Sequence, residues 1–140
     1  MWGALREGIS EVSSIIVLEQ SPRFQGELQT QWSLQRGSRA DDGDAAISSV
    51  ESARSVSEVI SFVDAKSKGV VVADLAVGHP DVLRLLEGWN RSWPIVVVGP
   101  RDIAELEWPL RELGATSVLF EPVKPLRLLA MCQRVLRVAA

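Results

Sequence analysis

The stretch Gly69-Val70-Val71-Val72-Ala73-Asp74-Leu75 decides the fold. A short, continuous apolar run bounded by glycine and by the turn Gly78-His79-Pro80 is typical of a strand that is buried on both faces. Such strands lie in the middle of parallel sheets that carry helices on either side. Ligands of open α/β sheets bind beyond the carboxyl ends of the strands, which is where Asp74 falls. The stretch alone leaves two interpretations of Asp74 open: a functional carboxylate, or a cap for the next loop or helix.

Length and composition limit the class of protein. The chain has 140 residues, which predicts one domain at 14–140 preceded by an N-terminal arm at 1–13. A net charge of −3 argues against a nucleic-acid-binding surface, because such surfaces are usually basic. The single cysteine, Cys132, excludes an internal disulfide. The sequence shows no signal peptide and no apolar run of roughly 18 residues. We therefore expect a cytoplasmic protein with no membrane partner.

The rest of the chain alternates between short apolar runs and helical patterns. Strands are expected at 14–18, 46–50, 70–74, 94–99 and 116–120. Helices are expected from Ser21-Pro22 to Gly37, from Ser55 to before Gly69, from Pro80 to Gly88, from Asp102 to Gly114, and from Pro125 onward. Capping boxes are predicted at Ser55–Glu58 and at Asp102–Glu105. Proline at position 109 should kink or split its helix.

Five βα units predict an α/β protein with three layers and one parallel sheet, because right-handed crossovers place helices on both faces. The run at 46–50 is short and partly polar, as in an edge strand. This favours the flavodoxin-like strand order 2-1-3-4-5. Its switch point lies between the first and third strands, which brings Glu19 and Gln20 next to Asp74.

Residues 14–138 resemble a response-regulator receiver domain. The strongest local match is Gly114-Ala115 followed by the strand to Phe120 and then Glu121-Pro122, where the family typically has Gly-Ala, a strand and Lys-Pro. Val70 to Leu75 resembles the strand that ends in the family's phosphorylated aspartate. Pro94 to Pro100 resembles the strand that typically ends in Thr or Ser. The resemblance implies the flavodoxin-like fold and a role in two-component signal transduction or a phosphorelay.

The resemblance also assigns positions. Asp74 matches the phospho-acceptor, Glu19 and Gln20 match the acidic pair that helps to hold magnesium, and Gly99 matches the switch hydroxyl residue. Glu121 matches the lysine that contacts the phosphoryl group, and Pro122 matches the cis-proline. A second alignment places Lys124-Pro125 on the family's Lys-Pro, but it needs a three-residue insertion after Phe120.

These positions lack the side chains that phosphorylation needs. Asp74 and Glu19 would be weak ligands for magnesium, and the sequence implies no other cofactor. Gln20 offers only a neutral carbonyl, and Gly99 has no hydroxyl. An anion at Glu121 in place of a cation costs a few kcal/mol at about 4 Å, even with an effective dielectric constant near 20. The resemblance thus implies an atypical receiver, or pseudo-receiver, in which phosphorylation of Asp74 is impaired or lost.

The leading hypothesis is a non-enzymatic signalling or protein-interaction module. Its partner would be a signalling protein such as a histidine kinase, and homodimers would form through the fourth helix, fifth strand and fifth helix, as in relatives. Two alternatives remain open. One is a phosphorylatable single-domain receiver that uses Asp74 with magnesium. The other is a small flavodoxin-like enzyme or ligand-binding domain with its pocket at Glu19, Asp74 and Gly99. The sequence has no Gly-rich phosphate loop, and we interpret His79 as a turn residue and Cys132 as core.

Overall fold

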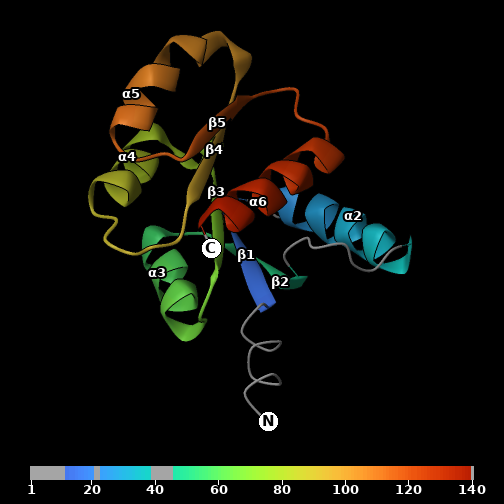
Figure 1. The fold of residues 1–140 in the computed structure, drawn as a ribbon. Helices are drawn as coiled ribbons and strands as arrows, with labels where there is room; N and C mark the ends of the chain where they lie inside the picture. The colour runs from blue at the N-terminus through green and yellow to red at the C-terminus, as the bar shows by residue number, and fades with distance from the viewer. Residues whose placement is uncertain (1–11, 21–22, 39–45, 140) are drawn as a thin grey trace.

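The computed structural model describes residues 12–20, 23–38 and 46–139 (Figure 1). Most of the expected N-terminal arm, the helix start at Ser21-Pro22 and the loop at 39–45 lie outside these residues. None of the helices within them combines the length and the apolar character needed to cross a membrane.

One five-stranded parallel sheet forms the middle layer. Its strands are β1 (Val12–Leu18), β2 (Ala46–Ala53), β3 (Gly69–Asp74), β4 (Ile95–Gly99) and β5 (Ser117–Phe120). Their order is β2-β1-β3-β4-β5, and every pairing is parallel. The predicted fold class and strand order are confirmed, and β3 is the central strand, buried along its whole length.

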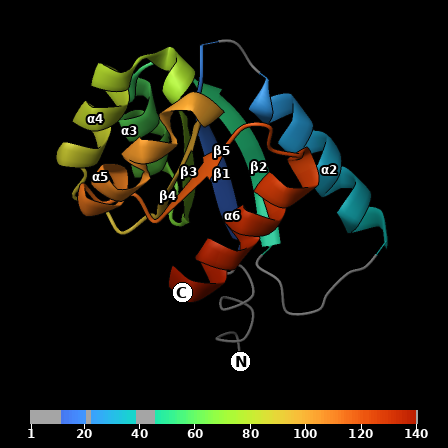
Figure 2. The same cartoon turned by 90° about the horizontal axis from the view of Figure 1, so that it is seen from above.

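Helices cover both faces of the sheet, as Figure 2 shows. They are α2 (Phe24–Ser38), α3 (Val56–Ala65), α4 (His79–Glu87), α5 (Glu107–Glu112) and α6 (Pro125–Ala139), with the 3-10 turns η1 (Leu75–Val77) and η2 (Arg101–Leu106). The two-residue period of the buried strands explains the layers. Val70 and Val72 of β3 pack with α2 and α6, whereas Val71 and Ala73 pack with α3, α4 and α5.

Three local expectations fail. Helix α2 continues through Gly37 to Ser38. The break in the predicted 102–113 helix lies at Ile103 (φ −116°, ψ 32°) and not at Pro109. Pro109 is the third residue of α5, in the first turn, where a backbone N–H has no intrahelical acceptor to lose. No side chain caps η2, so the Asp102–Glu105 box does not form, whereas Ser55 accepts from the Glu58 amide at 3.2 Å as expected.

Candidate functional site

Asp74 lies at the carboxyl end of β3 and is only 6% exposed. Its Oδ1 accepts a hydrogen bond from the Ala76 amide at 3.0 Å, so the carboxylate caps the η1 turn. Its Oδ2 lies 3.9 Å from Nη2 of Arg23. The structural interpretation of Asp74 as a cap is therefore correct, and one carboxylate oxygen also faces a cation.

Glu19 follows β1 and is 1% exposed, so it is not a surface acid. Its Oε1 accepts from the amides of Arg23 (3.0 Å) and Phe24 (2.9 Å). Its Oε2 accepts from the amide of Gln25 (3.1 Å) and from the hydroxyl of Ser52 (3.1 Å). These amides belong to the first turn of α2, whose N–H groups have no partner within the helix. Glu19 thus satisfies the amino-terminal end of α2, and four donors already occupy its carboxylate.

Arg23 is the residue that the sequence analysis missed. Its Nη2 donates to Oε2 of Glu121 at 2.6 Å, and the same nitrogen is the one that faces Asp74. The guanidinium also lies over the ring of Phe24, 4.0 Å from its centroid. One cation therefore links three elements: the start of α2, the end of β3 and the segment after β5. The sequence offered one signal for this role. It has an arginine shortly after the first strand, and it has an anion, Glu121, at the family's lysine position.

Glu121 follows β5, and its amide donates to the Gly99 carbonyl at 2.8 Å. Its carboxylate pairs with the Arg23 guanidinium. The Glu121–Pro122 peptide bond is cis. Lys124 is exposed and, among the described residues, forms no ion pair with Asp74. The structure therefore brings Glu121 to Asp74 through Arg23.

Gly99 is buried at the end of β4, and the space beside it is filled. A Cβ atom added there would lie 2.7 Å from Cδ1 of Leu75 and 3.3 Å from Cδ1 of Ile103. Leu75 directly follows Asp74, so its side chain takes the room that a hydroxyl residue at 99 would need. Gln20, the other member of the expected acidic pair, is exposed.

Burial raises the pKa of Asp74 above its usual value. The Ala76 amide and the Arg23 guanidinium act in the opposite direction, while Glu121 and Glu19 raise the pKa further. Burial therefore disfavours the charged form of this carboxyl, and the Arg23 guanidinium favours it.

The residues present do not fit a receiver's magnesium ion. That ion prefers several oxygen ligands in near-octahedral geometry. Here the Glu19 carboxylate accepts hydrogen bonds from the amino-terminal end of α2 and from Ser52. The Gln20 side chain is neutral, and the Arg23 guanidinium already faces Asp74. Within 12–20, 23–38 and 46–139, no group of three or more His, Cys, Asp or Glu side chains is placed to hold a metal.

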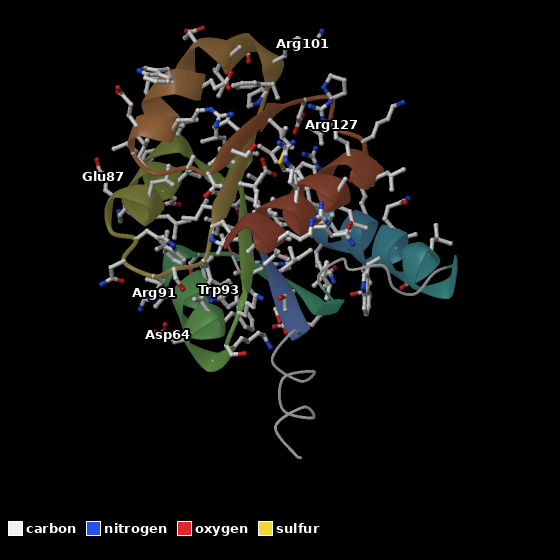
Figure 3. The ribbon with its side chains drawn as sticks, in the orientation of Figure 1. Asp64, Glu87, Arg91, Trp93, Arg101 and Arg127 are labelled. Carbon is white, nitrogen blue, oxygen red and sulfur yellow. The ribbon has the colours of Figure 1, made fainter. Side chains whose placement is uncertain are left out.

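Other features of the structure lie away from this site. A cavity of about 80 Å³, lined by Lys68, Gly69, Trp93 and neighbours, opens at the opposite end of the sheet. Near it Arg91 forms two hydrogen bonds to Asp64, at 2.8 and 3.0 Å (Figure 3). Cys132 is fully buried in the α2–α6 layer, as expected for core. The side chain of His79 lies outside the described residues.

No protein-family model matches the sequence, and no curated protein matches it. Solved structures are similar. The receiver domain of the TMAO respiratory system response regulator TorR is 16% identical, with a TM-score of 0.73 over 91% of this chain and 99% of that one. The chemotaxis response regulator CheY4 of Vibrio cholerae is 18% identical, with a TM-score of 0.66 over 89% and 99%.

A third similar structure is described as a redox sensor of the streptococci, from a family that evolved from two-component response regulators. It is 14% identical, with a TM-score of 0.68 over 90% of this chain and 52% of that one. At these identities the likeness concerns the fold. Together with the observed strand order, it shows that this chain has the fold of the response-regulator receiver domain.

Proposed function

We propose that this protein is an atypical receiver that acts through protein–protein contact and does not use magnesium-dependent phosphorylation of Asp74. The observation that carries the proposal is the single guanidinium of Arg23 between Asp74 and Glu121. In a phosphorylatable receiver, catalysis is positioning and charge neutralisation around the acceptor. Here the Arg23 guanidinium already balances the negative charge of Asp74.

A phosphoryl group on Asp74 would meet an unfavourable field. It would bring new negative charge next to Glu121, whose carboxylate shares a nitrogen with Asp74. At about 4 Å and an effective dielectric constant near 20, a pair of unit charges interacts by about 4 kcal/mol. Each 1.36 kcal/mol of barrier is a factor of about ten in rate. The Arg23 guanidinium, 3.9 Å from Asp74, offsets part of this repulsion.

The partner surface we propose is the face formed by α5, β5 and α6, hereafter the output face. Its helices carry the exposed apolar side chains Trp108 on α5 (67% exposed) and Leu126 on α6 (52% exposed). The η2–α5 side carries four acidic residues and two arginines, so it is net negative, whereas α6 carries three arginines and no acidic residue. Figure 3 shows Arg127 at the start of α6 and Arg101 on η2. A two-fold dimer would place the acidic side of one copy against the basic side of the other.

The streptococcal redox sensors give a precedent for a receiver-derived fold with another input. A signalling protein such as a histidine kinase is the class of hetero-partner that we propose for the same face. Sedimentation or light scattering would test self-association directly. A dimer that Trp108→Glu dissociates, but Leu83→Glu on α4 does not, would support the output face. A monomer at all accessible concentrations would rule out the dimer while leaving a hetero-partner as the proposal.

The phosphorylation part is tested with beryllofluoride, a mimic of the acyl phosphate. We expect no change in tryptophan fluorescence when magnesium and beryllofluoride are added to the wild-type protein. The combination Gln20→Asp, Arg23→Ala and Glu121→Lys should create a response, and Asp74→Asn in that background should abolish it. A saturable response of the wild-type protein that Asp74→Asn removes would instead establish the alternative, a phosphorylatable receiver.

A further inference from the structure

The position of Arg23 points to a regulatory role for a residue outside the expected site. Its guanidinium contacts the carboxylates of Asp74 and Glu121 through the same nitrogen, at 3.9 and 2.6 Å. Asp74 is nearly buried, and an ionised carboxylate there needs a compensating cation. No other cation among the described residues forms an ion pair with Asp74.

We propose that Arg23 is a tethered counter-ion: it takes the place that a divalent cation would otherwise fill and holds the segment after β5 in one arrangement. This inference rests on the proposed function. It adds a named residue and a mechanism by which the output face becomes independent of a bound metal.

The backbone explains how Arg23 is held. Its own amide donates to Glu19, as do the next two amides, so the first turn of α2 is fixed to the end of β1. The Phe24 ring lies against the guanidinium. Arg23 is therefore aimed from a rigid helix start, although its side chain is 49% exposed.

Glu121 carries the effect to the output face. It lies directly after β5, and four residues later Pro125 begins α6, which contributes Leu126 and Arg127 to that face. Its amide bonds to Gly99 and its carboxylate bonds to Arg23, so the segment is held at both its backbone and its side chain. Loss of Arg23 would release the second of these contacts.

The loss would also leave two carboxylates near each other without their cation. Two acidic oxygens that converge on one point are the start of a divalent cation site. A substitution of Arg23 should therefore do something that a purely structural change would not do: it should give the protein a specific response to magnesium.

The test compares thermal unfolding in magnesium chloride and in sodium chloride at matched ionic strength, with no phosphodonor present. We expect the wild-type protein to melt at the same temperature in both salts. Arg23→Gln should melt about 5 °C higher in magnesium at ten times the dissociation constant of the new site. Arg23→Lys should behave as wild type, and Arg23→Gln with Asp74→Asn should lose the response.

Hydrogen exchange gives a second readout. In Arg23→Gln the amide of Glu121 should exchange about two- to fivefold faster than in wild type, the effect expected for an exposed ion pair. The charge swap Arg23→Glu with Glu121→Arg puts the cation on the other segment, and it should restore both the slow exchange and the indifference to magnesium. If Arg23→Gln does not fold, the charge-swapped variant should still fold and can be measured in its place.

A magnesium-specific shift in the wild-type protein would overturn the inference, as would an Arg23→Gln variant that matches wild type in both measurements. Failure of the proposed function is a separate event. It would appear as beryllofluoride binding to the wild-type protein, whereas the tethered counter-ion is tested on variants without any phosphoryl mimic.

Discussion

The assignment of Glu19 as the cap of α2 can be tested by substitution. Its position suggests a metal ligand, but its contacts make it the cap of α2. We predict that Glu19→Ala strongly destabilises the fold. Loss of a helix cap costs about 1–2 kcal/mol. The Phe24 amide, whose 2.9 Å bond to Glu19 is buried, would lose its acceptor, and an unsatisfied buried donor costs about 1–3 kcal/mol.

The sum is about 3 kcal/mol, because the amides of Arg23 and Gln25 are only partly buried and water can replace their acceptor. For a domain of this size we expect a fall in melting temperature of about 10 °C. Glu19→Gln keeps the volume and one oxygen but loses the charge at the helix end, so about 1–2 kcal/mol should be lost. Urea unfolding followed by circular dichroism measures both values.

The matched control is Glu105→Gln, a change of an exposed acid on η2. It should alter the free energy of unfolding by less than about 0.5 kcal/mol. If Glu19→Ala were as mild as this control, the cap assignment would be wrong, and Glu19 would again be free to act as a ligand.

Three further predictions concern Gly99, Asp74 and Cys132. Gly99→Ser should destabilise by about 1–3 kcal/mol through overpacking against Leu75, and Leu75→Ala should absorb part of that penalty in a double-mutant cycle of urea unfolding; additive losses would contradict the contact. Because burial raises the Asp74 pKa, the folded state binds this proton more tightly than the unfolded chain, so its contribution to stability should fall as pH rises from the unfolded value through the folded one. Asp74→Asn should remove that pH-dependent loss of stability, which unfolding curves at a series of pH values would measure. The prediction fails if Asp74→Asn and the wild-type protein lose the same stability as the pH rises. Burial raises the pKa of Cys132 to about 12, so the thiol should react with a maleimide only after unfolding, and rapid labelling of the native protein would show that the helix layer is open.

Much of the fold was predictable because its signals are local and agree with each other. The continuous apolar run of β3 indicated a central strand, and the polar character of β2 indicated an edge strand. The break at Ile103 was misplaced because the first turn of a helix tolerates proline, and a sequence alone does not show where that turn begins. The boundaries of helices and strands depend on the tertiary structure, which local sequence patterns do not show.

The site was predictable in position but not in chemistry. The topology brings the ends of β1, β3 and β4 together, so Glu19, Asp74 and Gly99 were correctly placed at one end of the sheet. The direction of a side chain is decided by its partners. Glu19 turns to the amides of α2, and Arg23, which has no counterpart in the expected motif, reaches Asp74 and Glu121.

The central claim is that the acceptor position of this receiver fold is not phosphorylated, and intact mass tests it most directly. The wild-type protein is incubated with magnesium and acetyl phosphate, and its mass spectrum is recorded beside that of Asp74→Asn. We predict identical spectra with no phosphoryl adduct on either protein. An adduct of one phosphoryl group on the wild-type protein, absent from Asp74→Asn, would contradict the account.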